Sequence, residues 1–578
     1  MRTLWVIHAH QTDDLSDNIT AWQTQCQDLV VLSDAADLPH AHPLKYAKAL
    51  LGQTLPALIF DARDGFALDY FLCAAHTIED QGVLIIITTH FNGDDPQSAR
   101  FHNTCIPTPH FQQHLNACLA CYAQPFDLDH IQHNAITATD VMLTNEQQYV
   151  ITQLQNFSTG ILTLFAPRGT GKSTVIAHFL QAVDNFVLTA PNQPSLKRYA
   201  QHVDNFKAPD DLFLNHAPKS FEWLIIEEAA QMPIAHLEKL SALAHKVILI
   251  SSVDNYEGTG QGLAQKLHAI LPIEQALTLT KSQRFDDQDP VARFCQAIAL
   301  QESCTESLPE GLNLYDHDGL TALQSQSEYI QALYQFLNAH HYQTNAQDVR
   351  RLFDGHNQLF ITDVQNSTLR GAIWALKEGE LSTDLAVDIF NGYRRPKGNL
   401  VVQTLGAHSY YPELMTKKSL RVSRIAVDHA HRHQGIASNM LMQLIEYAKV
   451  HQYDFISTSF GLTEDLLNFW QQAGFTWVHM GTHRDKTTGL HAAILLYPLT
   501  DAMQTLIERM AQKWRADAYH LLDAPFVHTS VHPCLQTIAK PASFDALDIK
   551  ILTAHQQHKK PKEAVFSALQ RQILQNDQ

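Results

Sequence analysis

The amino-acid sequence predicts a multidomain α/β protein that ends in a helical region. The chain has 578 residues, a length typical of three or four domains. Short apolar runs alternate with helical patterns along much of it, as in parallel α/β domains. Two glycine-containing loops, at residues 166–173 and 432–438, each follow an apolar strand and precede a helical pattern. We expect four domains, which span residues 1–135, 136–340, 341–500 and 501–578.

The composition restricts the cellular setting and the partners. Hydrophobic residues make up 45% of the chain, yet no run of about 18 apolar residues occurs, so we expect no membrane span. The first residues are too polar for a signal peptide, and eight scattered cysteines indicate a reducing cytoplasm. The net charge of −18 argues mildly against nucleic acid as a partner, although an acidic total can hide a local basic groove.

The sequence pattern of the N-terminal region predicts a small parallel α/β domain. Apolar runs at 4–7, 29–32, 57–60 and 83–88 have the length of buried strands, and helical patterns lie between some of them. No phosphate-binding loop follows any of these runs, so a recruitment or packing role is favoured. The lone Cys-x-x-Cys pair of this region has no second pair at zinc-finger spacing, which favours packing over metal or redox chemistry.

A phosphate-binding loop opens the second domain. The strand 160–165 leads into APRGTGKS, which matches G-x-x-x-x-G-K-[ST] except that Ala166 replaces the first glycine. Alanine is the smallest substitute, so we expect the loop to survive. Backbone N–H groups of such a loop hold phosphates, Lys172 reaches the β and γ oxygens, and Ser173 ligates Mg²⁺. The predicted phosphate-binding residues are Arg168, Gly169, Thr170, Gly171, Lys172, Ser173 and Thr174.

Acidic and polar residues complete the predicted nucleotide site. An apolar strand ends in Glu227 and Glu228, as a Walker B segment does, although aspartate is usual at the first acidic place. We expect Glu227 to act on Mg²⁺ and Glu228 to orient the attacking water. Arg284 is a candidate for stabilising the γ-phosphate, with an ordinary surface arginine as the equal alternative. Gln147 lies at a capped helix start, and its amide can both donate to and accept from an adenine edge.

A second strand–loop–helix segment organises the third domain. After a helical pattern at 291–345, paired strands at 359–363 and 371–376 begin this domain. The segment 421–438 then reads as an apolar strand, a polar turn and helical spacing. Gly435 has no Cβ, so a ligand can approach the main chain, and free N–H groups at the helix start suit a pyrophosphate.

Two other features of the third domain leave alternatives open. The basic cluster at 394–398 suits phosphate contacts, although a solvated loop is equally common. His429, His431 and His433 alternate like metal ligands, but no carboxylate partner is evident in the sequence. A metal site in this turn is therefore disfavoured.

The sequence pattern after Pro498 predicts mostly helices. From Asp501 onward the sequence holds nine Lys or Arg and eight Asp or Glu, so this region is near +1 while the rest is near −19. Its densest basic run is at 559–562. An RNA backbone would be least repelled here, and an ordinary solvated helical tail is the alternative.

Several motifs resemble known families. Arg432-x-x-Gly435-x-Ala437 resembles the acetyl-CoA loop of GNAT acetyltransferases, and FWQQAGF resembles the second half of a GNAT domain. Together with APRGTGKST, LIIEEAAQMP and YEGTGQG, the order of domains resembles the bacterial tRNA(Met) cytidine acetyltransferases, which fuse a helicase-like ATPase to a GNAT domain. The resemblance implies N4-acetylation of the wobble cytidine of elongator tRNA(Met), with acetyl-CoA as donor and hydrolysis of ATP or GTP.

The same resemblance implies site residues. Gln147, the phosphate-binding loop and Arg284 match nucleotide-binding places of the family. Two further acetyl-CoA positions, a glutamate and an arginine in the family, are occupied here by Asp465 and Gln472. The implied acetyl-CoA residues are Ile425, Ala426, Val427, Arg432, His433, Gln434, Gly435, Ile436, Ala437, Ser438, Asp465 and Gln472.

The expected mechanism uses both loops. We expect the strand at 425–427 to splay from its neighbour, so that a backbone N–H polarises the thioester carbonyl while the cytosine amine attacks. ATP hydrolysis is expected to drive exposure of the wobble base rather than the acetyl transfer. The alternatives are an ATPase-regulated protein or small-molecule acetyltransferase, and an RNA remodeller whose GNAT fold only binds coenzyme A.

Overall fold

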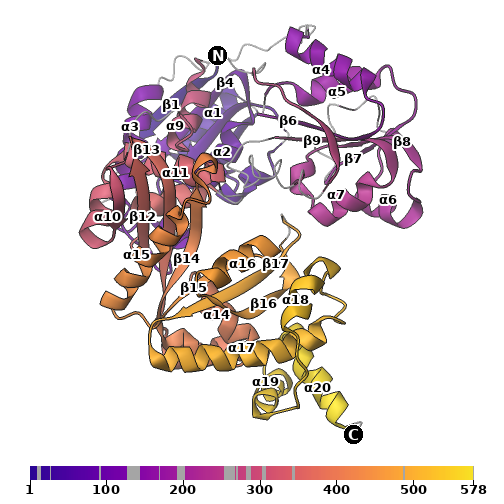
Figure 1. Cartoon of the computed structure of the whole chain (residues 1–578). Helices are drawn as coiled ribbons and strands as arrows, with labels where there is room; N and C mark the ends of the chain where they lie inside the picture. Colours follow the sequence, from indigo (N-terminus) through magenta and orange to yellow (C-terminus); the bar gives the residue numbers. More distant parts are fainter. Residues whose placement is uncertain are drawn as a thin grey trace. The chain divides into compact units, whose positions relative to one another are not determined.

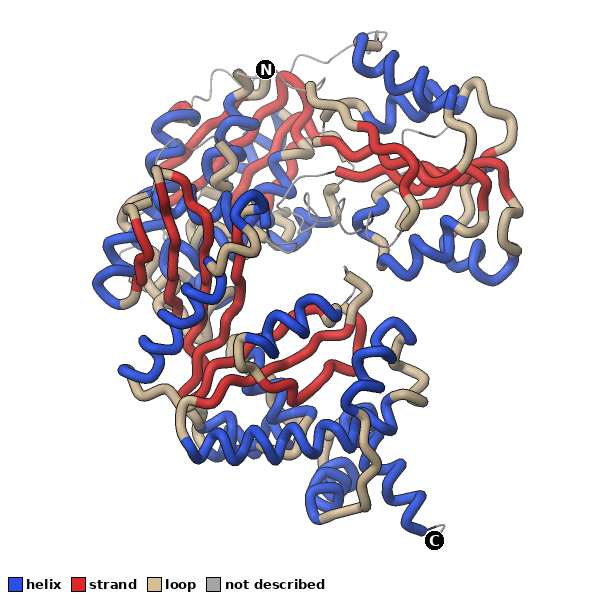
Figure 2. Tube along the Cα trace, in the orientation of Figure 1, coloured by secondary structure: helices blue, strands red, loops and turns tan. Residues whose placement is uncertain are grey.

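The computed structural model divides the chain into two compact units (Figures 1 and 2). Unit 1 comprises Met1–Thr305 and His341–Asp354, and unit 2 comprises Glu306–His340 and Gly355–Gln578. The four domain boundaries expected from the sequence are finer than this division and stay a prediction. The structure describes all residues except 10–14, 27, 39, 52, 90–92, 127–142, 168, 192–198, 200–201, 203, 253–266, 268–270, 282–287, 303–307, 341–344, 486–487 and 577–578.

Unit 1 begins with a parallel five-stranded sheet in the order β2-β3-β4-β1-β5. The four apolar runs expected as strands all lie in it, which confirms the predicted small α/β domain. Cys118 is buried on a helix of this domain, and burial raises the pKa of its thiol to about 12, as suits a packing residue. The elements are β1 (Thr3–His8), α1 (Ser16–Gln25), β2 (Leu29–Leu32), β3 (Leu55–Asp61), α2 (Leu68–Ala75), β4 (Ile78–Thr88), α3 (Pro109–Tyr122) and β5 (Gln124–Pro125).

A second parallel sheet of unit 1 carries the phosphate-binding loop. Its strand order is β10-β6-β9-β8-β7, and β6, β8 and β9 are largely buried, as strands of a sheet covered on both faces are. The loop after β6 and the acids after β8 lie at the carboxyl ends of the strands, where ligands of open α/β sheets bind. The elements are α4 (Asn145–Asn156), β6 (Gly160–Ala166), α5 (Lys172–Leu180), β7 (Phe186–Thr189), α6 (Pro209–Asn215), β8 (Phe221–Ile226), α7 (Ile234–Ser241), β9 (Ala244–Ser252), β10 (Ile273–Leu277) and α9 (Pro290–Ile298).

A short helix from later in the sequence also belongs to unit 1. This helix, α12 (Ala346–Asp354), places Arg350 in a buried ion pair with Asp95. The carboxylate of Asp354 accepts the backbone N–H groups of His110 (3.0 Å) and Phe111 (2.9 Å) at the start of α3, and burial raises its pKa to about 6. The helix is therefore held in unit 1 by buried polar contacts.

Unit 2 is built on a seven-stranded sheet in the order β11-β12-β13-β14-β15-β17-β16. The pairing is antiparallel except between β14 and β15, which run parallel. The expectation that 291–345 is helical was wrong for β11. This strand has only five residues, in which Leu312 and Leu314 alternate with other residues, and so short a pattern does not distinguish an edge strand from a helix. The strands are β11 (Gly311–Tyr315), β12 (Gln358–Gln365), β13 (Thr368–Gly379), β14 (Lys418–Val427), β15 (Phe455–Gly461), β16 (Thr476–Arg484) and β17 (His491–Pro498).

Helix α15 packs its apolar stripe onto one face of this sheet. Ile436, Met440, Leu441, Leu444 and Ala448 are all buried at the spacing predicted from the sequence, in one core with residues of β12, β13 and β14. The helices between the strands are α10 (His317–Gln324), α11 (Ser327–His340), α13 (Thr383–Phe390), α14 (Leu400–His408), α15 (Ile436–Val450) and α16 (Glu464–Gln472).

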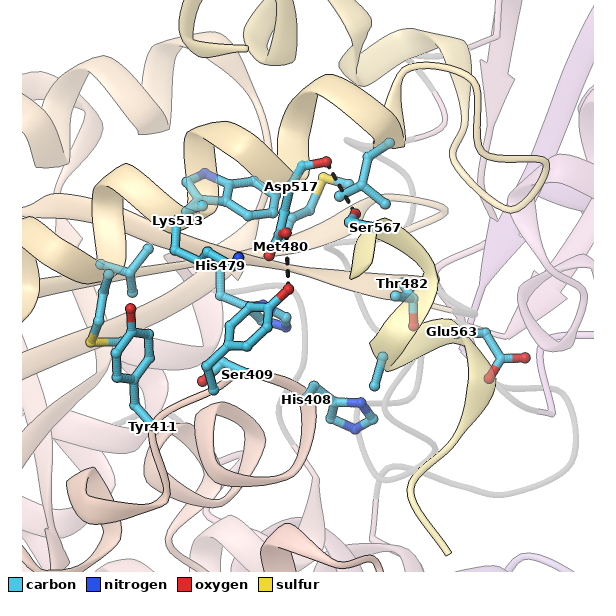
Figure 3. Close-up of a pocket in the computed structure, with 16 residues that line it drawn as sticks. His408, Ser409, Tyr411, His479, Met480, Thr482, Lys513, Asp517, Glu563 and Ser567 are labelled. Carbon is cyan, nitrogen blue, oxygen red and sulfur yellow. Dashed lines mark hydrogen bonds between the residues drawn. The ribbon is translucent and has the colours of Figure 1, made fainter. Parts of the chain in front are cut away.

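The region from Asp501 onward forms helices, as predicted, and these helices are packed into unit 2. Figure 3 shows one place where they meet: the Ser567 hydroxyl donates to the Asp517 carbonyl (3.2 Å) beside a cavity also lined by His479. Lys513 and Arg571 are buried and paired with carboxylates. None of the described helices has the length and apolar character needed to cross a bilayer. The helices are α17 (Asp501–Leu521), α18 (His532–Ile538), α19 (Ala546–Gln557) and α20 (Phe566–Asn576).

Candidate nucleotide and acetyl-CoA sites

The loop between β6 and α5 has the backbone of a phosphate cradle. Gly169 and Gly171 have φ of 80° and 88°, and Gly171 begins α5 without a side-chain cap, so the first N–H groups of the helix keep no intrahelical acceptor. Ala166 is the last residue of β6, fully buried and paired with Ser252, so this position needs none of the conformational freedom of glycine. The alanine substitution is thus compatible with the loop.

The loop is closed on itself by its own lysine. The Lys172 ammonium donates to the carbonyl oxygens of Ala166 (2.8 Å) and Pro167 (2.9 Å). Only 9% of Lys172 is exposed. A phosphate in this loop would therefore have to draw the ammonium away from two carbonyl groups.

The acid after β8 is tied to the loop. The Ser173 hydroxyl donates to Oε1 of Glu227 (2.8 Å), and the Tyr199 hydroxyl donates to Oε2 (3.0 Å). Burial and the neighbouring Glu228 raise the pKa of Glu227 to about 7. The serine hydroxyl and the carboxylate are the oxygen donors that Mg²⁺ prefers, so these residues fit the metal expected from the sequence. The sequence did not point to Tyr199, which comes from a segment without a motif.

Glu228 adopts an unusual backbone conformation. Its φ is 50°, in the left-handed region that residues other than glycine rarely adopt. Its Oε2 is buried and has no hydrogen-bond partner among the described residues. A buried carboxylate oxygen without a donor is suited to a water molecule, and the water-orienting role of Glu228 stays a prediction.

Gln147 braces the phosphate loop. Its side-chain Oε1 accepts the N–H of Thr144 (3.0 Å), which completes a capping box at the start of α4, and its Nε2 donates to the carbonyl of Thr170 (3.1 Å). The side chain is 2% exposed. Contact with an adenine remains a prediction, because the amide is already engaged with the protein. Arg168, Arg284 and the YEGTGQG segment lie outside the described residues.

The sheet of unit 2 opens between β14 and β15. The two strands pair only from Ser419 to Val422, opposite Phe455–Thr458, although they continue to Val427 and Gly461 (Figure 1). A bulge at this point shifts the register between β13 and β14. The predicted splaying of the strand at 425–427 is confirmed.

Two backbone N–H groups point into this opening. The N–H of Asp428 donates to the carbonyl of Arg370 in β13 (2.8 Å). Because successive residues of a strand direct their N–H groups to opposite sides, those of Ile425 and Val427 point away from β13, and that of Ala426 points toward it. Ile425 and Val427 are therefore the donors available to a carbonyl oxygen in the opening.

The turn after β14 presents an uncapped helix start. Gly435 has φ of 79°, begins α15 without a side-chain cap, and a Cβ there would meet no atom within 4 Å. The first N–H groups of α15 belong to Ile436, Ala437 and Ser438, which have no intrahelical acceptor. Arg432, His433, Gln434 and Ser438 are exposed around this point. The arrangement suits a pyrophosphate, as the sequence predicted.

The two substituted family positions lie on α16. Asp465 is in its first turn and Gln472 is its last residue, and both are exposed. Seven residues of helix separate them by about 10 Å along one face. Their role in acetyl-CoA binding stays a prediction.

A carboxylate with two imidazoles follows the opening directly. Asp428 Oδ1 accepts the N–H of Ala430 (3.0 Å) and lies 3.0 Å from Nδ1 of His431, and its Oδ2 lies 3.8 Å from Nε2 of His340. The hydrogen bond to His431 lowers the pKa of Asp428. The expectation that these histidines lack a carboxylate partner was therefore wrong for His431. Within the described residues, no group of three or more His, Cys, Asp or Glu side chains is placed to hold a metal ion.

Comparison with protein families matches three parts of the chain. Residues 1–126 match the model described as tRNA(Met) cytidine acetyltransferase TmcA, N-terminal. Residues 163–301 match the helicase domain of RNA cytidine acetyltransferase NAT10/TcmA, and residues 448–500 match GNAT acetyltransferase 2. The three matches follow the order of domains expected from the sequence.

Curated relatives match along most of the chain. The tRNA(Met) cytidine acetyltransferase TmcA of Photorhabdus asymbiotica is 32% identical over 82% of this chain and 73% of its own length. The proteins of the same name from Actinobacillus pleuropneumoniae and Pectobacterium atrosepticum are 32% and 30% identical, over 84% and 94% of this chain and 83% of each relative. The chain belongs to the tRNA(Met) cytidine acetyltransferase family.

Proposed function

We propose that this protein acetylates N4 of the wobble cytidine of elongator tRNA(Met), with acetyl-CoA as donor, and that it hydrolyses ATP or GTP in the same cycle. The observation that carries the proposal is the opening between β14 and β15, which leads to the uncapped start of α15 in a chain that also has a phosphate loop. Membership of the family supports the identity of the RNA.

The acetyl transfer is proposed to use the backbone of β14. The pyrophosphate of acetyl-CoA binds the N–H groups around Gly435, and the thioester carbonyl accepts from Ile425 or Val427. The cytosine N4 attacks the carbonyl carbon, the carbon–sulfur bond breaks, and coenzyme A leaves as a thiolate. We assign acceptance of the N4 proton to the cluster of Asp428, His431 and His340, because it follows these donors directly in the chain.

The nucleotide site is proposed to act on the RNA rather than on the acetyl group. Ser173 and Glu227 would hold Mg²⁺, which supplies charge neutralisation at the β and γ oxygens. Lys172 binds the same oxygens, and Glu228 orients the attacking water. Acetyl transfer from a thioester needs no phosphoryl input, so hydrolysis serves to expose the wobble base from its anticodon stack.

The proposal is tested by mass spectrometry of nucleosides from tRNA incubated with the pure protein, acetyl-CoA and ATP. We expect N4-acetylcytidine in tRNA(Met) only when acetyl-CoA is present, and much less when ATP and GTP are omitted. A tRNA from which the wobble cytidine has been replaced by uridine is the control substrate. Acetylation of peptides or polyamines with tRNA left unmodified would overturn the proposal in favour of a protein or small-molecule acetyltransferase.

A further inference from the structure

Two basic segments that lie far apart in the sequence meet in unit 2. The loop between α13 and α14 contains residues 391–398, and the loop between α19 and α20 contains residues 558–562. The N–H of Lys559 donates to the carbonyl of Asn391 (2.9 Å). Gly392 has φ of 87°, and a Cβ on it would lie 2.5 Å from the carbonyl oxygen of Lys559. Only glycine lets the two loops approach this closely.

A buried lysine fixes the junction. Lys560 is 2% exposed, and its ammonium donates to the carbonyls of Phe390 (3.1 Å) and Ala407 (2.7 Å). The amide of Gln403 donates to the carbonyl of Pro396 (2.9 Å), which holds the α13–α14 loop from within. The junction is therefore a built part of the fold.

The other cations of the two loops are left on the surface. The basic patch consists of Arg394, Lys397, Lys559 and Lys562, all exposed, around Tyr393. Among the described residues, no carboxylate forms an ion pair with Arg394, Lys559 or Lys562. Glu563 is the acid that adjoins the patch in sequence. The junction thus concentrates positive charge on a chain whose net charge is −18.

The patch also presents an aromatic ring. Tyr393 is 47% exposed, its hydroxyl hydrogen-bonds Nδ1 of His558 (3.0 Å), and the Lys559 ammonium lies 5.7 Å from its ring centre. Exposed aromatic rings beside cations are the combination on which unpaired bases stack while phosphates are neutralised.

We propose that the basic patch binds the sugar–phosphate backbone of the tRNA substrate, with an unpaired base stacked on Tyr393. This inference rests on the proposed function, which supplies the tRNA. It also revises the role expected for the C-terminal helices. Two of their basic side chains, Lys513 and Arg571, are buried in ion pairs, so the RNA contacts come from the junction of the tail with the α13–α14 loop.

The test compares two triple variants that change the net charge equally. R394Q/K559Q/K562Q removes three of the four positive charges of the patch, and R515Q/K540Q/K449Q removes three exposed positive charges elsewhere in unit 2. Binding of tRNA(Met) is measured by fluorescence anisotropy over a salt series. We expect the patch variant to bind at least about tenfold more weakly near 0.1 M salt, with a salt slope lower by about 2 to 3, and the control to bind within about threefold of wild type. Melting temperatures and acetyl-CoA affinities check that both variants fold.

Tyr393→Ala is measured beside the triple variants. It is expected to weaken binding several-fold while leaving the salt slope unchanged, because stacking releases no counterion. Equal loss of affinity in both triple variants, or displacement of tRNA by polyglutamate as readily as by RNA, would overturn the proposal. If wild-type protein acetylates tRNA while the patch variant binds tRNA normally, this inference fails and the proposed function stands. If wild-type protein neither binds nor modifies tRNA, the proposed function fails.

Discussion

The protein contains two loops with the same local design and opposite surroundings. Each joins a strand to a helix through a left-handed glycine, Gly171 or Gly435, that begins the helix without a side-chain cap. The phosphate loop is filled by its own side chains: Lys172 bonds two loop carbonyls and Gln147 braces a third. The loop at Gly435 faces open space. The comparison shows that one loop must rearrange its side chains around a ligand, whereas the other offers main-chain donors that are already free.

The largest expected effect is on the closed loop. Lys172→Ala removes the ammonium that stabilises the β and γ oxygens, so we expect ATP hydrolysis to fall at least about a hundredfold. Acetyl-CoA affinity, measured by calorimetry, should stay unchanged. Lys207→Ala, at a half-exposed surface ion pair, is the matched control. If K172A, in the presence of ATP, acetylated tRNA as fast as the wild-type protein does, the coupling between the two loops would be refuted.

The second largest effect is expected on acetyl transfer, when the cluster of Asp428, His431 and His340 is changed. Asp428→Asn removes the charge that holds His431, and we expect the single-turnover rate of acetyl transfer to fall about a hundredfold with acetyl-CoA affinity unchanged. The acidic limb of the pH–rate profile should change shape, because the Asp428 carboxylate, whose pKa the hydrogen bond to His431 lowers, is no longer there to titrate.

Among the described residues, the charged and titratable side chains that face this carboxylate are His431 and His340. Arg370 is the residue before Gly371, which lies opposite Val427 in the sheet, and its guanidinium forms an ion pair with Asp363. Asp384→Asn, at an exposed helix start, is the control. A slower variant whose pH–rate profile keeps the wild-type shape would assign Asp428 a structural role only.

The open loop can be tested at its glycine. Gly435→Ala adds a methyl group where the pyrophosphate approaches, at a φ that costs an alanine about 1 kcal/mol. We expect acetyl-CoA to bind about tenfold more weakly, as measured by calorimetry. Gly311→Ala is the matched control, because Gly311 also has a positive φ and open space around its missing Cβ. Similar affinities in the two variants would contradict ligand binding at this turn.

The smallest effect concerns pH, and it has opposite signs in the two units. Burial raises the pKa of Glu227 to about 7 and of Asp354 to about 6, so between pH 7 and pH 5 folded unit 1 binds more protons than its unfolded chain and gains stability as pH falls. Burial lowers the pKa of His408 to about 4 and of His479 to about 3, so unit 2 loses stability as pH falls below about 6.5.

Hydrogen exchange followed by mass spectrometry at pH 7 and pH 5 distinguishes the units, because peptides report on each separately. We expect opening free energies in unit 2 to fall by on the order of 2 kcal/mol, with Asp517, whose pKa is raised by burial, acting in the opposite direction. The opening free energies in unit 1 should stay the same or rise. A parallel fall in both units would contradict the assignment.

The strands and both glycine loops were predictable because they depend on short-range patterns. Apolar runs of four to seven residues and a glycine at a helix start are visible without knowledge of the fold. The position of Ile425 and Val427 in the splayed strand was also expected, from the resemblance to known acetyltransferases. In each case the residues that define the feature are close together in the sequence.

Contacts between distant segments were not predictable. Tyr199 reaches Glu227 from a segment without a motif, His340 approaches Asp428 across 88 positions, and Lys560 bonds Ala407 from the tail. The burial of Lys513, Lys560 and Arg571 removes from solvent three cations of the tail that sequence alone counts as available to RNA. A charge count treats every lysine alike, whereas packing decides which of them meets solvent.

The return of α12 to unit 1 has a consequence for how this protein can be divided. The backbone passes from unit 1 to unit 2 after Thr305, comes back at His341 and leaves again after Asp354. No single proteolytic cut releases unit 1 whole. A fragment that stops at Thr305 would leave the buried Asp95 without Arg350, a loss of about 3–5 kcal/mol. A gene rearrangement that transplanted unit 1 to another protein would have to carry two separate stretches of coding sequence.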